Sequence, residues 1–192
     1  MKKFRYIVAF MFVSLLRIFV SERERSLIIE DAESYFNFRE EKYSFGNFVK
    51  AFIEMPEFRS VVYYRLRNRL RYPLKWFFPG MSNLYINSTD IAGGLFFIHG
   101  FSTIVNAKKI KRNCMIFQQV TIGFSKEGTP IIGENVTVCS GAIVIGPITI
   151  GNNVTIGAGA VVIKDVPDFA IVAGNPARIV GYNKGDKLVG RE

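Results

Sequence analysis

A six-residue period runs through the second half of the chain and limits what it can fold into. Between residues 132 and 166 an aliphatic residue opens each unit of six, and a second small or branched apolar residue follows four positions later. The opening residues are Ile132, Val138, Val144, Ile150, Ile156 and Val162, and the second set is Val136, Ala142, Ile148, Val154, Ala160 and Val166. Neither a helix of period 3.6 nor a plain alternating strand has this spacing. The period predicts short strands joined by corners, stacked so that each coil buries its apolar edge on the next.

The same period extends upstream and is interrupted twice. Its upstream opening positions are Tyr85, Ile91, Phe97, Ile104, Ile110, Ile116 and Ile122. One extra residue separates Phe97 from Ile104, and four extra residues separate Ile122 from Ile132. Because a break in a rigid repeat usually marks a loop, and loops on rigid scaffolds often carry function, we expect functional residues near both breaks.

The segment before the repeat has a different composition and is predicted to be helical. It holds most of the phenylalanines and of the basic residues. Pro56 suits the first turn of a helix in which Phe58, Val61, Val62 and Leu66 share one face. The arginines of residues 59–71 are expected to form a solvated or interface surface. The predicted organisation is a helical region over 1–84, a repeat domain over 85–183 and a tail over 184–192.

Residues 6–16 form a continuous apolar run that is open to three interpretations. The run is too short to span a bilayer, and Arg17 ends it. We favour a helix buried in the core or in a subunit interface. The alternatives are a helix through residues 1–20 in peripheral contact with a membrane, and a cleaved signal, for which residues 21–25 offer no convincing cleavage point.

Composition narrows the functional classes. The formal net charge of +9 favours phosphate-bearing or membrane-surface partners. Two cysteines are too few for a disulfide framework, so we expect a cytoplasmic protein, with the inner face of the membrane as the alternative location. Cys114 and Cys139 occupy small-residue positions of the repeat and are expected to be packing residues. With one histidine and no Cys/His cluster no metal site is expected, and no nucleic-acid partner is expected because no aromatic–basic module appears.

The repeat and several local motifs resemble the hexapeptide-repeat acyltransferases, and within them the serine acetyltransferase branch. The matching motifs are Gly-Leu-Phe-Phe-Ile-His-Gly (94–100), Phe-Gln-Gln-Val-Thr-Ile-Gly (117–123), Ile-Gly-Ala-Gly-Ala (156–160), Lys-Asp-Val-Pro (164–167) and Ala-Gly-Asn-Pro-Ala-Arg-Ile-Val-Gly (173–181). The resemblance implies a mainly β fold, a left-handed parallel β-helix preceded by an α-helical region. It also implies a homotrimer, with a dimer of trimers as the alternative. Acetyl-CoA would bind between neighbouring β-helices, and its acetyl group would pass directly to a hydroxyl.

The resemblance also assigns site residues. His99 matches the catalytic histidine, which suits a general base because a neutral imidazole accepts a hydroxyl proton. The positions matching the coenzyme-binding stretch are Ser140, Gly141, Ala158, Gly159, Lys164 and Arg178. The carboxylate that orients the histidine in this branch falls at Leu84 here. We therefore expect Asn87, Asp90 or a backbone carbonyl to orient His99, or the first two to bind the acceptor.

Two departures from the branch bear on the acceptor, a small molecule or a saccharide. Ile98 stands where serine acetyltransferases carry an aspartate, and the extended loop reads Gly128-Thr129-Pro130 where they carry Arg-His. Because these charges recognise an amino acid, their loss favours a sugar hydroxyl in cell-surface polysaccharide biosynthesis. The alternatives are a serine O-acetyltransferase of cysteine biosynthesis and a non-catalytic trimeric scaffold.

Overall fold

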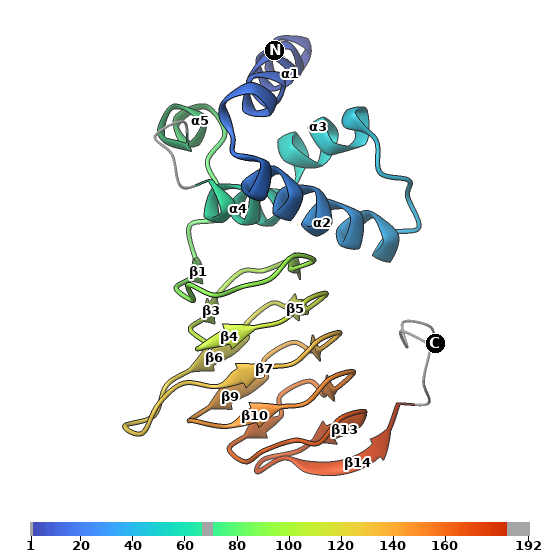
Figure 1. Cartoon of the computed structure of the whole chain (residues 1–192), viewed down its shortest axis with the longest axis vertical. Coiled ribbons are helices and arrows are strands. Elements are labelled where there is room, and N and C mark those ends of the chain that lie inside the picture. The colour runs from blue at the N-terminus through green and yellow to red at the C-terminus, as the bar shows by residue number, and fades with distance from the viewer. Residues whose placement is uncertain (1, 67–70, 184–192) are drawn as a thin grey trace.

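A computed structural model describes residues 2–66 and 71–183, in which helices precede a stack of short strands (Figure 1). The helices are α1 (Lys2–Phe19), α2 (Glu22–Phe38), α3 (Phe45–Glu54), α4 (Pro56–Arg65) and α5 (Arg71–Phe77). The helices end at Phe77 and the first strand begins at Leu84, and the division into domains at residues 84 and 85 stays a prediction. The predicted tail over 184–192 lies outside the described residues.

The strands form the three faces of a parallel β-helix. The strands are β1 (Leu84–Ile86), β2 (Phe96–Ile98), β3 (Thr103–Val105), β4 (Lys109–Ile110), β5 (Met115–Phe117), β6 (Thr121–Gly123), β7 (Ile131–Ile132), β8 (Thr137–Val138), β9 (Ile143–Ile145), β10 (Thr149–Ile150), β11 (Thr155–Ile156), β12 (Val161–Val162), β13 (Ala170–Ala173) and β14 (Arg178–Tyr182). Face A has the order β1-β3-β6-β9-β12, face B β10-β7-β4 and face C β14-β13-β11-β8-β5-β2. Among the strands of the described residues, β14 alone pairs antiparallel, with β13. The predicted left-handed parallel β-helix is confirmed, with about five coils.

The repeat positions between residues 132 and 166 all face the interior. Every opening residue and every residue of the second set is at most 7% exposed. Upstream, the prediction is wrong at Tyr85 and Ile104, which are 53% and 42% exposed and lie side by side in paired strands. Val105 points inward instead and is fully buried. Because successive residues of a strand point to opposite faces, the corner at residues 99–102 shifts the inward position of the following strand by one residue, from Ile104 to Val105. Tyr85 pairs with Ile104 and points outward with it.

This inward register predicts a difference between two chemically identical substitutions. Ile150→Val removes one methyl group from a fully buried side chain, and we expect it to lower the free energy of unfolding by about 0.5–1.5 kcal/mol. Ile104→Val removes the same group from an exposed side chain and is expected to change stability by less than about 0.5 kcal/mol. Urea denaturation followed by circular dichroism measures both. Equal losses would contradict the register.

Asparagine side chains form a ladder along the corner between faces B and C. Asn113, Asn135 and Asn153 all have positive φ, between 54° and 58°. The Nδ2 of Asn113 donates to Oδ1 of Asn135 at 3.2 Å, and the Nδ2 of Asn135 donates to Oδ1 of Asn153 at 3.0 Å. Asparagine tolerates the left-handed region better than most residues, which explains its use at these corners.

The helices pack against the first coils through a second apolar core. Outward side chains of β2 and β5, Phe96 and Met115, join this helical core. Pro56 begins α4, as predicted, and the four apolar residues predicted to share one face of this helix, Phe58, Val61, Val62 and Leu66, are at most 5% exposed. α4 is therefore buried on several sides, with Val61 in the core of the β-helix and the other three residues in the helical core.

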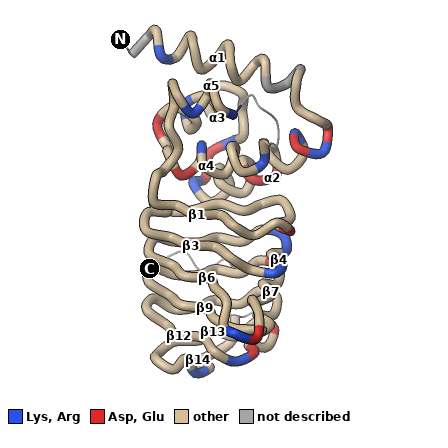
Figure 2. Tube along the Cα trace, turned by 90° about the vertical axis from the view of Figure 1, so that its left-hand side faces the viewer, with Lys and Arg blue, Asp and Glu red and all other residues tan. Residues whose placement is uncertain are grey.

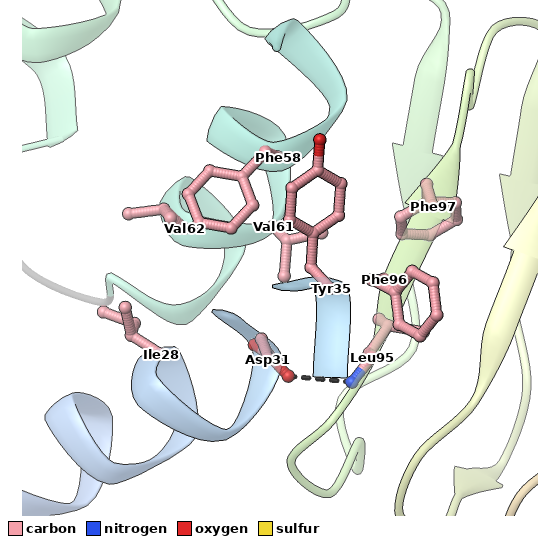
Figure 3. Close-up of a pocket in the computed structure, with 9 residues that line it drawn as sticks. All are labelled: Ile28, Asp31, Tyr35, Phe58, Val61, Val62, Leu95, Phe96 and Phe97. Carbon is pink, nitrogen blue, oxygen red and sulfur yellow. Dashed lines mark hydrogen bonds between the residues drawn. The ribbon is translucent and has the colours of Figure 1, made fainter. Parts of the chain in front are cut away.

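The prediction of a solvated arginine surface is wrong for two of its members. Arg59 and Arg65 are only 6% and 5% exposed. Arg65 pairs with Asp31 of α2, which also accepts a hydrogen bond from the backbone N–H of Leu95 (Figure 3). Arg59 donates to the carbonyl oxygens of Phe52, Ile53 and Pro79. Arg67 and Arg69 lie outside the described residues.

Candidate active site

His99 lies at the corner where the chain turns from face C to face A. It follows β2 directly, is exposed, and has φ +63°. Gly100 is also left-handed, at φ +55°, and its N–H donates to the carbonyl of Ile98 at 2.8 Å. The first break in the repeat therefore forms a tight corner that carries the imidazole. His99 is therefore the residue at this break for which we predict a function.

The register of face C brings the predicted coenzyme residues into line with His99. Ile98 pairs with Phe117, and the two strands after β5 stay in step through Thr137 and Thr155. Continued past the strand ends, this register stacks His99, Gln118, Ser140, Ala158 and Gly174 in one column. The N–H of Gly141 donates to the carbonyl of Gln118, and that of Gly159 to the carbonyl of Ser140, at 3.0 and 2.9 Å. We call this set the corner column.

Its length follows from the strand spacing. Parallel strands lie about 4.8 Å apart, so Ala158 lies about 14 Å along the column from His99. Gly141 and Gly159 have φ +70° and +66°, which only glycine adopts readily. A Cβ added at Gly159 would meet nothing within 4 Å, and one at Gly141 would have its nearest neighbour at 3.9 Å. These glycines serve the backbone conformation of an open edge, not a tight packing contact.

Two of the predicted coenzyme-binding residues, Lys164 and Arg178, lie apart from each other. Arg178 opens β14 and pairs with Ala173, so it lies beside the far end of the corner column. Lys164 follows β12 on face A, at the corner leading to face B. Both side chains are exposed. One chain therefore brings Arg178 to the corner column and leaves Lys164 on a different edge.

Asn87 and Asp90 also lie on a different edge from His99. They follow β1 and precede Ile91, at the corner between faces A and B. Asp90 forms an exposed ion pair with Lys109, with 3.2 Å between Oδ2 and Nζ. Within one chain these residues do not reach the imidazole, so their role toward His99 remains a prediction. The loop of residues 123–130 leaves the same edge as Asn87 and Asp90.

The structure brings two further polar residues to this end of the molecule, which the sequence did not indicate. Glu57, near the start of α4, is only 9% exposed, and its Cβ would lie 3.2 Å from a Cβ added at Gly100. Leu84, at the position of the family's orienting carboxylate, lies within 3.4 Å of the same point. In the column itself, the side-chain Oε1 of Gln118 is buried and has no hydrogen-bond partner among the described residues. No sequence signal placed the Glu57 carboxyl of α4 beside the corner at Gly100, 43 positions further along the chain.

Neither cysteine has the properties of a nucleophile. Burial raises the pKa of the Cys114 thiol to about 12, and burial also raises the pKa of the Cys139 thiol. Cys114 is 1% exposed, and its Sγ lies 3.2 Å from the carbonyl oxygen of Gly133. Both thiols therefore stay protonated at neutral pH and act as packing groups.

A cysteine substitution tests this assignment. Cys139 directly precedes Ser140 of the corner column. We expect Cys139→Ala to keep the acetyl transfer that the resemblance implies within about twofold of the parent rate, since a protonated thiol contributes no nucleophile. The measurement is the initial rate of free thiol release from acetyl-CoA. A loss of activity that Cys139→Ser restored would contradict a pure packing role.

Metal ligands do not gather in the part of the chain that the structure describes. No group of three or more histidine, cysteine, aspartate or glutamate side chains in residues 2–66 and 71–183 could hold an ion.

Comparisons with known proteins agree with this fold and with the motifs. Residues 129–164 match the family model described as bacterial transferase hexapeptide (six repeats). A serine acetyltransferase of Bacillus subtilis is 38% identical over 113 residues, 56% of this chain and 51% of that protein. The crystal structure of a serine acetyltransferase from Brucella abortus superposes with a TM-score of 0.70 at 25% identity, covering 90% of this chain and 74% of that one.

A second structure of the Brucella abortus enzyme, in complex with coenzyme A, has a TM-score of 0.68 at 24% identity and covers 89% of this chain and 72% of that one. At that identity the likeness shows a shared fold. The chain spans about half the length of the curated relatives it matches. The chain folds as a left-handed β-helix and carries a stretch that matches the hexapeptide-repeat model. Over the matched part it is similar to the serine acetyltransferases.

Proposed function

We propose that the protein is an acetyl-CoA-dependent O-acetyltransferase in which His99 is the general base. The observation that carries the proposal is the corner column, which aligns the imidazole with the open backbone of residues 140–141 and 158–159. A linear thioester arm fits along such an edge, with its acyl group at His99. The curated relatives, named serine acetyltransferases, support the same chemistry.

The proposed reaction is a direct transfer. The Nε2 or Nδ1 lone pair of His99 takes the acceptor's hydroxyl proton while that oxygen attacks the thioester carbonyl. The carbonyl π electrons move to oxygen, where backbone N–H groups of the corners stabilise the negative charge. Collapse of this intermediate breaks the C–S bond, and the imidazolium returns its proton to the departing sulfur. General base catalysis of this kind contributes about 10²–10⁴-fold.

The proposed coenzyme contacts follow the column. The unpaired Oε1 of Gln118 suits an amide N–H of the pantetheine arm, because a buried acceptor without a partner costs free energy that a ligand donor recovers. Ser140, Gly141, Ala158 and Gly159 would flank the arm with backbone groups. Arg178, at the far end, would meet the nucleotide phosphates. Lys164 would contribute from its own edge.

A homotrimer would complete the site. His99 and the loop of residues 123–130 lie on different edges of one triangular prism. Packing prisms around a threefold axis would bring one edge of each chain against a different edge of its neighbour, so the loop, Lys164 and Asp90 of one chain would face the corner column of the next. This arrangement gives the residues that one chain keeps apart a shared site.

Two acceptors are candidates, and the comparisons support the one that sequence reasoning ranked second. The names of the curated relatives favour serine. Against it, Ile98 packs against the helical core, and no arginine or second histidine stands in residues 128–130. Without these charges the site suits a neutral hydroxyl, such as that of a sugar. We propose serine as the acceptor because the curated relatives are named serine acetyltransferases. We retain a sugar hydroxyl as the second candidate because of Ile98 and of the uncharged residues 128–130.

Thiol release from acetyl-CoA, measured against serine and against a panel of nucleotide sugars and oligosaccharides, separates the candidates. For serine we expect a Michaelis constant in the ordinary range of about 1 μM–1 mM. Turnover of sugars alone would assign the neutral acceptor. If calorimetric titration detected no binding of acetyl-CoA, the transferase proposal would fail and the non-catalytic scaffold would take its place.

A further inference from the structure

Helix α1 is apolar on two opposite sides, and only one of them is covered. Ala9 and Val13 are 0% and 4% exposed and face the helical core. Successive residues of a helix are rotated by about 100°, which sets a second apolar stripe about 180° from this pair. The stripe consists of Phe4, Ile7, Met11 and Leu15, which are 67%, 59%, 60% and 42% exposed. A helix with a single buried face would carry polar residues there.

The flanks of α1 are occupied, which leaves the stripe as its outward face. On one side Phe12 contacts Phe77 of α5, with 6.1 Å between ring centroids. On the other side Phe10 contacts Phe45 of α3, with 5.1 Å between centroids. Figure 1 shows α1 at the end of the molecule opposite β14, with α5 beside it. The stripe therefore lies at this terminal end, remote from the C-terminal coils.

Helix α5 extends the exposed surface with aromatic side chains. Leu74 is 1% exposed and faces the core, whereas Tyr72 and Trp76, on the opposite side of the same short helix, are 60% and 81% exposed. We define the α1–α5 face as Phe4, Ile7, Met11, Leu15, Tyr72 and Trp76. A run from residue 4 to residue 15 of a helix is about 16 Å long, so the apolar part is continuous and not a set of scattered side chains.

The charges that α1 and α5 themselves carry have one sign, although Glu54 of the neighbouring α3 accepts a hydrogen bond from the Tyr6 hydroxyl of α1. Neither helix contains an aspartate or glutamate. Arg5 and Lys75 are exposed and Arg71 is partly exposed. The guanidinium of Arg5 lies 5.8 Å from the ring centroid of Phe78, the residue that follows α5, so it lies on the side of α1 that faces this end of α5. In Figure 2 the α1 tube carries a blue segment near its N-terminus and no red.

We propose that the α1–α5 face docks on an anionic lipid bilayer, with α1 lying in the plane of the interface. Bulky apolar side chains on one face, with Trp, Tyr, Arg and Lys beside them, are the composition of helices that insert at the headgroup level. A second copy of this face is a poorer occupant, because a twofold contact would set Arg5 and Lys75 against their own copies. No described helix is long and apolar enough to cross the bilayer, so the contact is peripheral. The proposal does not depend on the proposed enzymatic function.

The single tryptophan of the chain reports directly on this contact. Trp76 is 81% exposed, so its fluorescence in water is that of a solvated indole. The full chain is mixed with vesicles of phosphatidylcholine, and with vesicles in which about one third of the lipid is phosphatidylglycerol. We expect a blue shift of the emission and quenching by brominated acyl chains with the anionic vesicles. Raising the salt to about 1 M should weaken the binding, since the Debye length falls to about 3 Å. An unchanged spectrum with anionic vesicles would overturn the proposal.

Two double variants separate the apolar and ionic contributions. Ile7→Gln with Met11→Gln removes two inserted side chains, and we expect the partition coefficient onto anionic vesicles to fall at least about tenfold. Arg5→Gln with Lys75→Gln should lower it by a similar factor and abolish the preference for anionic lipid. Val180→Gln, a change of an exposed apolar residue on β14 that is 65% exposed, is the matched control and should bind like the parent chain.

Sedimentation velocity without lipid distinguishes the bilayer from another chain. All variants should have the parent's oligomeric mass, because the α1–α5 face makes no subunit contact in the proposal. If Ile7→Gln with Met11→Gln lowered that mass and left vesicle binding unchanged, the face would be an interface between copies and the proposal would be wrong. Equal vesicle binding by this variant and the Val180→Gln control would also contradict it.

Discussion

Replacing His99 with asparagine is expected to lower the rate of acetyl transfer by about 10²–10⁴-fold without loss of the fold. The imidazole supplies the general base, and an amide cannot accept the hydroxyl proton. Asparagine is the informative substitute because His99 has φ +63°, a conformation that asparagine adopts at small cost. The measurement is kcat/KM for thiol release, with circular dichroism to follow the fold.

A second substitution controls for backbone strain. Asn135→Ala makes a comparable change at a left-handed corner on another edge, where φ is +54°, and it also removes hydrogen bonds to Asn113 and Asn153. We expect this variant to lose stability and keep its activity. If His99→Asn kept the parent rate, the catalytic assignment would be wrong, although the β-helix would be unaffected.

Replacing Arg65 with methionine is expected to lower the free energy of unfolding by about 3–5 kcal/mol, because it leaves the Asp31 carboxylate buried without its cation. The Nε and Nη2 atoms of Arg65 donate to the two carboxylate oxygens at 2.7 and 2.9 Å. The same guanidinium donates to the carbonyl oxygens of Ile91 and Ala92 at 2.6 and 2.7 Å, which ties α4 to the first coil. Urea denaturation measures the loss.

Two variants show whether this loss comes from the unpaired charge. Arg112→Met breaks the exposed pair with Glu30, in which the arginine side chain is 63% exposed, and should cost no more than about 1 kcal/mol. Adding Asp31→Leu to Arg65→Met removes the stranded carboxylate and should recover part of the stability. A double variant as unstable as the sum of the single ones would show that the two residues act independently.

The loss should also depend on pH. Burial raises the pKa of the Asp31 carboxyl from 3.8 to about 6, against the opposing effect of Arg65 and of the Leu95 N–H. The folded chain then binds this proton more tightly than the unfolded chain, so the contribution of Asp31 to stability decreases as the pH rises from 3.8 to about 6. Without Arg65 the pKa rises further, and the decrease continues to higher pH. The deficit of Arg65→Met relative to the parent should therefore be larger at about pH 8 than at about pH 5.

The repeat domain could be predicted from the sequence because the six-residue period coincides with the positions whose side chains point inward. Ile132 and Val144 could be assigned from spacing alone, since each coil repeats the same burial. The assignment failed at Ile104, because the preceding corner of unusual length changes which of two neighbouring residues points inward. It failed in the same way at Tyr85, which pairs with Ile104. Arg65 was misjudged for another reason. Nothing in the local pattern shows that a carboxyl from another helix lies opposite it.

The candidate site was predictable only in part. The resemblance supplied His99 and the coenzyme positions, and the parallel register explains why Ser140 and Ala158 share an edge with His99 although they are far away in sequence. Glu57 could not be found in this way, because it lies in α4, outside the repeat. Only the packing of the helices on the first coil brings Glu57 near Gly100. Asn87 and Asp90 are close to His99 in sequence, yet a triangular coil separates neighbouring segments onto different edges.

The fixed rise of the parallel stack also sets a unit of length for anything bound along it. A complete coil without a loop takes 18 residues, as the pairing of Thr137 with Thr155 and of Ile143 with Val161 shows. Deleting or duplicating one such coil between His99 and Ala158 would shorten or lengthen their separation by about 4.8 Å and leave each remaining corner in its original orientation. A β-helix of this kind can therefore accommodate extended ligands of different length by a change in the number of whole coils, while the contacts within each coil stay the same.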